Sequence, residues 1–454
     1  MKRSLVLAGG GMRVAWQAGV VKALAEEGLE FQHIDGTSGG ILTAGMMLSG
    51  IPAEEMCRRW SGVDVKDFSS ALPFADYVKG PWSLPALGDA DGILGKIFPA
   101  LGINAKSIRD RAAGPDAVEG SFNVVEFTSK QCHAIDALHI DAELMAAGMS
   151  LPIFLKPLRR DGKIWTDAVW VRDANIGEAL RRGAEEMWLI WCIGNSPYWG
   201  DGPLEQYVHM IEMSAMGALL ADFEAAAAAG REFVLHVIRP EHPLPLDPEF
   251  YLGRIDADTL IGMGYRDARA YIGTMSPTGL AKDPLCTAMT EPSPGVRFID
   301  VLHGELDGQP LTFRAAVVTP SEPGEGLAQL SGHLDYPPWG RVFLAGGHVE
   351  TVGDDMAYRF RLRLNGGWRD AAVIRTLHDD PGADAWSDSR NARLHLGEQV
   401  VDLTMSLIDA AGLLASVEPV GVHGLAGRAQ AIAASQPTDS GSCCADTNRV
   451  PASM

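Results

Sequence analysis

The chain has 454 residues, of which 46% are hydrophobic and 21% are charged, and its formal net charge at pH 7 is −20. This composition is typical of a globular protein, and the length favours two domains over one compact core. The acidic balance argues against nucleic acid as a partner, because phosphate binding needs a basic surface. Adsorption to anionic lipid is disfavoured for the same reason, so a lipid substrate would have to be drawn in by apolar contact.

A glycine-rich turn opens the chain. An apolar strand predicted over residues 4–8 ends in the run A-G-G-G-M-R at residues 8–13, which precedes an amphipathic helix predicted over residues 15–27. Such a turn presents backbone N–H groups at a helix N-terminus, where the helix dipole also favours negative charge. Those amides are the donors that the oxyanion of an acyl-transfer intermediate requires. Arg13 either orders this turn or binds an anionic group of a substrate.

A second turn has the pattern G-x-S-x-G. The run Gly36-Thr37-Ser38-Gly39-Gly40 follows a short apolar segment at residues 33–35 and precedes a helix predicted over residues 41–48. A strand, a sharp turn and a helix in this order form a nucleophile elbow, because the glycines leave room for a strained turn that lifts the serine Oγ clear of the sheet. Ser38 is therefore the candidate nucleophile.

Strand-like and helix-like segments then alternate to about residue 272, which indicates a mostly parallel sheet with helices on both faces. Residues 63–110 interrupt the pattern and are read either as an irregular surface excursion or as a mobile cap. Helices are predicted over residues 53–60, 141–148, 176–182, 204–229 and 256–272, and strands over 122–127, 155–160, 163–166, 187–193 and 233–238.

After residue 277 the pattern changes to short apolar runs separated by turn clusters. The runs at residues 297–302, 311–318, 341–344, 356–364 and 371–377 are typical of antiparallel β structure. We therefore predict an α/β domain at residues 1–280, a β-rich accessory domain at residues 281–400, and a helical segment with a disordered tail at residues 401–454.

Three motifs in order resemble the signature of the patatin-like phospholipase family over residues 1 to about 280. They are the triple-glycine turn, the G-T-S-G-G turn, and Asp167-Ala168 at the end of a strand, with Asn175 a little further on. The resemblance implies a dyad without histidine, in which Ser38 attacks and Asp167 accepts the proton. It also implies a patatin-like fold, no metal and no cofactor, and an oxyanion hole formed by Gly9, Gly10, Gly11 and Met12.

The family resemblance implies that the substrates are lipid esters, namely phospholipids, lysophospholipids or acylglycerols. Val14 and Ala168 stand where the family usually has glycine, which leaves open a catalytically weak or inactive protein that binds lipid or acyl groups. An acyl thioesterase is a further alternative. A Ser-His-Asp triad with His209 or His236 as the base is also left open, and no histidine spacing typical of a metal site is present.

The cysteine pattern and the absence of a long apolar run bear on location. Six cysteines are scattered along the chain, and only Cys443 and Cys444 are close together, which favours a reducing interior and a cytoplasmic protein. No run of about 18 apolar residues is present to span a bilayer. The apolar start breaks at the three glycines and is not read as a signal peptide. Peripheral contact with a membrane or a lipid droplet is left open, and the sequence predicts no oligomeric state.

Overall fold

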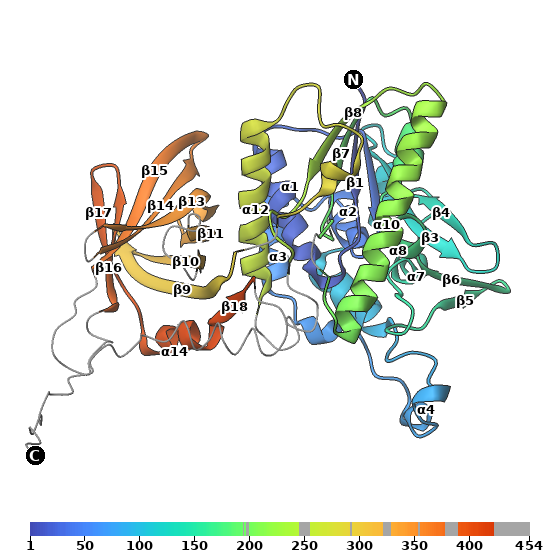
Figure 1. The fold of residues 1–454 in the computed structure, drawn as a ribbon, viewed down its shortest axis with the longest axis horizontal. Coiled ribbons are helices and arrows are strands. Elements are labelled where there is room, and N and C mark those ends of the chain that lie inside the picture. The colour runs from blue at the N-terminus through green and yellow to red at the C-terminus, as the bar shows by residue number, and fades with distance from the viewer. Residues whose placement is uncertain are drawn as a thin grey trace, which may run out of the picture.

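The computed structural model describes residues 1–193, 195–196, 199–244, 255–290, 293–320, 328–352, 355–376 and 389–421. Its two sheets lie on opposite sides of helix α12 (Ala257–Thr274) (Figure 1). The first sheet is flanked by helices and the second is antiparallel, so the predicted fold class is confirmed. Residues 422–454, which hold the predicted tail with Cys443 and Cys444, lie outside the described residues.

The first sheet has eight strands in the order β5-β6-β3-β2-β1-β7-β8, with β4 paired to β3. The pairs that involve β1, β2, β7 and β8 are parallel, whereas the pairs β3–β4, β3–β6 and β5–β6 are antiparallel. The strands are β1 (Arg3–Leu7), β2 (His33–Thr37), β3 (Glu119–Glu126), β4 (Gln131–Asp136), β5 (Leu158–Arg160), β6 (Lys163–Asp167), β7 (Glu186–Ile190) and β8 (Val234–Ile238).

Helices cover both faces of this sheet because its central strands are buried on both sides. In β1, Leu5 and Leu7 face a core shared with α1, α2 and α12, whereas Val6 faces a core shared with α9 and α10. The helices of this part are α1 (Ala15–Glu26), α2 (Gly40–Leu48), α3 (Ala53–Ser61), α4 (Phe74–Tyr77), α5 (Phe98–Leu101), α6 (Ala105–Ala112), α7 (Ala142–Ala147), α8 (Val169–Arg172), α9 (Ile176–Arg181) and α10 (Pro203–Ala228).

Most predicted elements of this part form close to their expected bounds. The hairpin β5–β6 turns at Asp161 and Gly162, which both have positive φ, and α7 is capped by the side chain of Asp141. Strand β4 was not predicted, because its partly exposed sequence lacks an apolar run. The excursion at residues 63–110 contains only short helices before α6, and α4 projects away from the body of the molecule (Figure 1).

The second sheet has ten strands, and its pairing closes on itself because β9 bonds to both β10 and β17. Phe313 stacks on Tyr358 and Phe360 in its interior. The strands are β9 (Gly295–Leu306), β10 (Gln309–Pro320), β11 (Ala328–Tyr336), β12 (Gly340–Phe343), β13 (Ala345–Val352), β14 (Asp355–Leu364), β15 (Gly367–Thr376), β16 (Asn391–Leu396), β17 (Gln399–Thr404) and β18 (Glu418–Val420).

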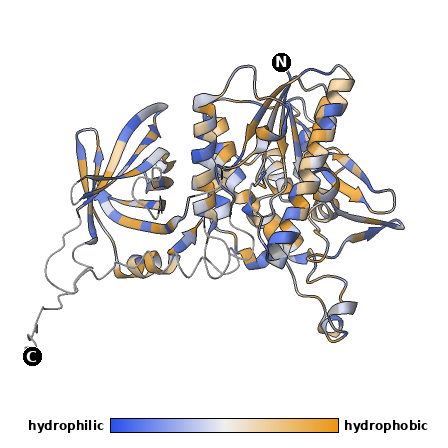
Figure 2. Cartoon of the chain, in the orientation of Figure 1, coloured by the Kyte–Doolittle hydropathy of each residue, from blue (hydrophilic) through white to orange (hydrophobic). Residues whose placement is uncertain are grey.

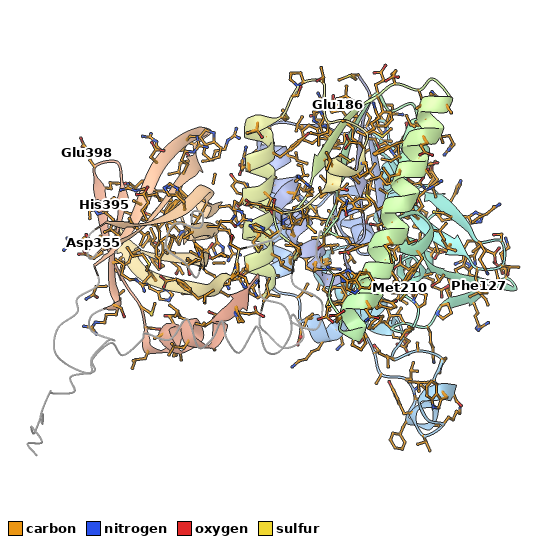
Figure 3. The ribbon with its side chains drawn as sticks, viewed as in Figure 1. Phe127, Glu186, Met210, Asp355, His395 and Glu398 are labelled. Atoms are coloured by element: carbon orange, nitrogen blue, oxygen red, sulfur yellow. The ribbon has the colours of Figure 1, made fainter. Side chains whose placement is uncertain are left out.

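Side chains pack against both sheets (Figure 3). His395 and Glu398 lie at the end of the second sheet that is remote from the first sheet. Helix α14 (Leu407–Ser416) follows β17 and is rich in apolar residues (Figure 2). The domain limits at residues 280 and 400 remain predictions. Strand β18, which lies after residue 400, pairs with β9 of the same sheet. In the described parts of the chain, no helix combines the length and the apolar character needed to cross a membrane.

Candidate active site

Ser38 lies in the turn between β2 and α2, at the carboxyl end of a central strand. Its φ is 51°, which is the left-handed region that residues other than glycine rarely adopt. A serine held there costs about 1–2 kcal/mol, so the surrounding structure must stabilise the turn. The side chain is only 7% exposed. The turn therefore has the strained conformation that the G-x-S-x-G pattern predicts.

The register of the sheet brings Asp167 to this serine. Thr37 pairs with Asn123 on β3, and the next residue of β3 pairs with Asp167 at the end of β6. Ser38 Oγ donates a hydrogen bond of 2.7 Å to Asp167 Oδ2. The other carboxylate oxygen accepts a bond of 2.9 Å from the amide of Val169, so both oxygens of the aspartate are fixed.

The burial of Asp167 decides its protonation. Removal from water raises the pKa of its carboxyl to about 7, and the hydrogen bonds from Ser38 and from the amides of Ala168 and Val169 partly oppose this shift. A carboxyl with a pKa near 7 exchanges protons readily at neutral pH. The side chain is thus suited to accept a proton from the serine and to return it.

Neither histidine considered as an alternative base is bonded to the serine. His209 Nδ1 lies 2.9 Å from Glu212 Oε2, and its Nε2 accepts a bond from the amide of Gly200. His236 Nδ1 lies 2.9 Å from the hydroxyl of Tyr271. Both rings are therefore engaged elsewhere, and the geometry favours the aspartate over a histidine as the partner of the nucleophile.

The triple-glycine turn after β1 packs directly on the serine turn. A Cβ added to Gly39 would lie 2.5 Å from the carbonyl oxygen of Gly11, and one added to Gly9 would lie 2.8 Å from Cβ of Ser38. Gly10 is held in the same way, because an added Cβ would lie 2.6 Å from Cβ of Cys192. The glycines are needed because the two backbones touch, and Gly11 also has a φ of 59°.

The predicted oxyanion donors do not all stay available. The amide of Gly9 donates a hydrogen bond of 2.7 Å to Asp173 Oδ1, so this geometry favours the other amides of the turn as oxyanion donors. Gly10 and Gly11 lie between that amide and the helix, and Met12 is buried behind them. The role of these three amides stays a prediction.

Arg13 orders the turn. Its Nε donates a hydrogen bond of 3.0 Å to the carbonyl oxygen of Gly10, and its own amide bonds to the same oxygen at 3.1 Å. This contact supports the structural alternative over anion binding. It fixes the carbonyl of Gly10 toward the arginine.

Val14 and Ala168 do not strain the site. Val14 has φ −66° and Ala168 has φ −91°, so both backbones lie in the right-handed helical region that any residue adopts. Neither position therefore requires glycine for its conformation.

Comparisons with known proteins identify a family for the first part of the chain. Residues 5–180 match the Patatin family, which is described as patatin-like phospholipase. This segment is a patatin-like phospholipase domain. No curated protein shows significant sequence similarity to the chain.

Among solved structures, the chain is similar to VipD from Legionella pneumophila, with a TM-score of 0.34 and 13% sequence identity. The alignment covers 60% of this chain and 66% of VipD, so the chain spans slightly less than two thirds of that protein.

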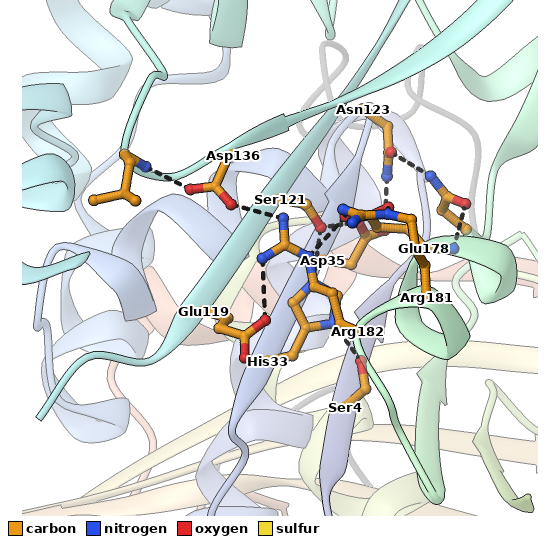
Figure 4. Close-up of polar contacts among 12 residues, drawn as sticks. Ser4, His33, Asp35, Glu119, Ser121, Asn123, Asp136, Glu178, Arg181 and Arg182 are labelled. Atoms are coloured by element: carbon orange, nitrogen blue, oxygen red, sulfur yellow. Dashed lines mark hydrogen bonds and ion pairs between the residues drawn. The ribbon is translucent and has the colours of Figure 1, made fainter. Parts of the chain in front are cut away.

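A buried polar network lies next to the candidate site (Figure 4). Asn123 donates through Nδ2 to Asp35 Oδ2 at 2.6 Å and to the hydroxyl of Thr37 at 2.9 Å, and its Oδ1 accepts a bond of 2.7 Å from Asn175. One amide side chain thus ties the strand before Ser38 to the segment after Asp167. The sequence analysis did not identify Asn123, because a single asparagine in an apolar strand carries no motif.

Asp35 and His33 complete this network. Burial raises the pKa of Asp35 to about 7, whereas burial and the charge of Arg182 lower the pKa of His33 to about 3. The histidine is therefore neutral, and its Nε2 lies 2.8 Å from the hydroxyl of Ser121, which also bonds to Asp35. The network holds β2 and β3 in fixed register beneath the nucleophile.

Asp173 is a second acid of the site that the sequence analysis missed. Its side chain is fully buried, Oδ1 accepts the Gly9 amide, and Oδ2 has no hydrogen-bond partner among the described residues. Burial and the nearby charge of Asp167 raise its pKa to about 7, partly opposed by the bond from Gly9 and by the charge of Arg13.

Aromatic side chains lie near Asp167. Tyr207 of α10 makes edge-to-face contacts with Phe154 and Trp170, with ring centroids 5.5 and 5.4 Å apart. Burial and the charge of Asp167 raise the pKa of Tyr207 to about 12, so its hydroxyl stays neutral and donates to the carbonyl of Pro152 at 3.0 Å. These rings give the acid an apolar neighbourhood.

A cavity of about 360 Å³ lies along α10, beyond these rings. Its described lining mixes polar and apolar side chains, and Ser38 and Asp167 are not among them. The lining residues are Asn195, Ser196, Trp199, His209, Glu212, Met213, Met216 and Gly217. Among the residues that the structure describes, no group of three or more histidine, cysteine or acidic side chains is arranged to hold a metal ion.

Proposed function

We propose that the chain is a serine acyl hydrolase that cleaves lipid esters through a Ser38–Asp167 dyad. The observation that carries the proposal is the 2.7 Å hydrogen bond from Ser38 Oγ to a buried carboxylate, beside a glycine turn that touches the same serine. The match of residues 5–180 to the patatin-like phospholipases supports this reading, because the family generally hydrolyses lipid acyl groups.

The proposed reaction has two stages. Ser38 Oγ attacks the ester carbonyl carbon while its proton passes to Asp167 Oδ2, and the amides of Gly10 and Gly11 stabilise the oxyanion. Collapse of this intermediate breaks the bond to the alcohol, which leaves with the proton from Asp167. Water then attacks the acyl-serine, gives its proton to Asp167, and releases the fatty acid with return of a proton to Ser38.

Lipid, rather than a small polar ester, is the proposed substrate because apolar side chains surround the site. Tyr207 contacts Phe154. The residue before Phe154 is hydrogen-bonded to the excursion at residues 63–110, because the amide of Leu87 donates to the carbonyl of Ile153 at 2.8 Å. That excursion exposes apolar side chains, including Trp82 at 99% exposure. Exposed apolar clusters of this kind mark contact surfaces, which favours peripheral contact with a membrane or a lipid droplet.

Hydrolysis of a short-chain nitrophenyl ester tests the proposal. We expect Ser38→Ala to abolish turnover, and Asp167→Asn to lower kcat by about 10³-fold or more because the base is lost. Covalent labelling by a fluorophosphonate should require Ser38. A rate for Ser38→Ala equal to that of the unaltered protein would show that the nucleophile is elsewhere.

The same labelling separates turnover from lipid binding without catalysis, because only an activated serine reacts. Val14 and Ala168 stand where the family usually has glycine, which is the sequence argument for an inactive protein. Both positions have ordinary helical backbone angles, so their conformation gives no support to that alternative. An acyl thioesterase would instead hydrolyse acyl-CoA faster than an oxygen ester of the same chain length.

A further inference from the structure

Asp173 is a buried acid that takes no part in the acyl-transfer steps proposed above. It follows α8, six residues after Asp167, and its side chain points to the turn after β1, where Oδ1 accepts the amide of Gly9 at 2.7 Å. A Cβ built on Gly9 would lie 2.7 Å from Asp173 Oδ1 and 3.4 Å from Ser38 Oγ. The acid and the nucleophile thus both lie close to the same glycine.

This contact fixes the direction of the glycine turn. The Gly9 amide points to Asp173, and the chain then continues through Gly10 and Gly11 before the helix begins. In peptide geometry, the orientation of one amide constrains the next peptide plane, because each residue has only two soft torsions. The bond from the Gly9 amide to Asp173 is therefore one of the contacts that hold the turn against the serine.

We propose that Asp173 is a positioning residue that acts through the Gly9 amide to hold the amides of Gly10 and Gly11 where the oxyanion forms. The inference rests on the proposed hydrolase function. It assigns to Asp173 no proton transfer and no contact with the substrate, since its hydrogen bond is to the Gly9 amide, whereas Ser38 bonds to Asp167.

The charged and titratable groups near Asp173 come from three elements. Arg13 lies on the glycine turn, Asp167 ends β6, and Cys192 follows β7. The ionised Asp167 disfavours a second negative charge at Asp173, and the same repulsion acts in the other direction. Loss of the acid at position 173 should therefore make Asp167 easier to ionise.

Three variants at this position separate positioning from simple stability. Asp173→Asn keeps an oxygen that accepts the Gly9 amide, Asp173→Ala removes it, and Asp173→Leu fills a similar volume without an acceptor. We expect Asp173→Ala and Asp173→Leu to lower kcat for the nitrophenyl ester by about 10²-fold with KM within about threefold, as for loss of one oxyanion donor. Asp173→Asn should keep kcat within about fivefold of the unaltered protein.

Asp222 provides a matched control. It is also buried, it has an oxygen without a hydrogen-bond partner among the described residues, and it accepts a glycine amide, that of Gly177. Its ion pair is with Arg172 at 2.9 Å, and not with the glycine turn. Asp222→Ala should lower thermal stability and leave kcat per folded molecule unchanged.

The pH profile supplies a second readout. In Asp173→Asn the acid limb of kcat/KM should move to lower pH, because the charge that opposes ionisation of Asp167 is removed, whereas Asp222→Asn should leave the limb in place. Values of kcat are divided by the concentration of serine that a fluorophosphonate labels at saturation, which corrects for unfolded protein.

Two results would overturn the proposal. One is a kcat for Asp173→Ala or Asp173→Leu within threefold of the unaltered protein, and the other is a kcat for Asp173→Asn as low as that for Asp173→Ala. Failure of the hydrolase function itself would look different, since Ser38→Ala would then hydrolyse the ester as fast as the unaltered protein.

Discussion

The pH dependence of ester hydrolysis should follow the ionisation of Asp167. A protonated carboxyl cannot accept the proton of Ser38, so the rate below the pKa is proportional to the ionised fraction. Burial raises this pKa to about 7, with the hydrogen bond from Ser38 opposing the shift. At pH 5, about two units lower, the ionised fraction and kcat/KM should both be near 1% of their plateau values.

The assay is the initial rate of nitrophenyl ester hydrolysis between pH 5 and 9, with the rate of Ser38→Ala subtracted at each pH. Circular dichroism at the same pH values identifies any loss of folded protein. An exposed aspartate would instead titrate near about 4 and leave the rate flat above pH 5. A flat profile over this range would refute the argument that burial controls the base.

Three further changes test other parts of the structure. Gly39→Ala should lower kcat by about 10²-fold or more, measured with the same ester, because the new Cβ would meet the carbonyl oxygen of Gly11 at 2.5 Å and displace the turn. Asp35→Asn should remove a pH dependence of the free energy of unfolding. Burial raises the pKa of Asp35 to about 7 in the folded protein, above its value in the unfolded chain. The stabilising contribution of this group is therefore present below about pH 4 and is lost as the pH rises through 7. Urea unfolding at pH 5 and 8 should then show the difference between the two proteins changing by more than about 1.4 kcal/mol, and an unchanged difference would contradict the burial argument. Trp82→Ala should weaken binding to phosphatidylcholine vesicles, whereas Trp368→Ala, at a half-exposed position on β15, should not; equal binding of both variants would exclude the excursion as the contact.

The sequence was sufficient to select Ser38 and Asp167 as candidates because the proposed chemistry needs recognisable local patterns. A strained turn at Ser38 needs glycine on both sides, and the turn that packs against it needs glycine for the same steric reason. Asp167 could be named because it ends a strand and precedes a small residue, as the resemblance to the patatin-like family implies. Each of these patterns is short and continuous in sequence, so each is visible without coordinates.

The supporting groups left no comparable signal. Asn123 and Asp173 are single polar residues whose importance depends on partners 52 and 164 positions away in the chain. The bond that engages the Gly9 amide was not foreseen for the same reason, since its acceptor is remote in sequence. Strands β11, β13 and β16 to β18 were also missed, because a closed ring of short strands gives only weak alternation between turns.

Helix α12 has a consequence for dissecting the protein. Three residues of this helix contact the second sheet. Gly262 allows a close approach of the backbone of Gly332, and the ring centroids of Tyr265 and Phe343 are 5.3 Å apart. Asp258 forms an ion pair of 2.6 Å with Arg341. A truncated chain that ends before β9 would leave these surfaces bare. We therefore expect the shortened protein to aggregate, and the intact chain to melt in a single cooperative transition that includes both sheets.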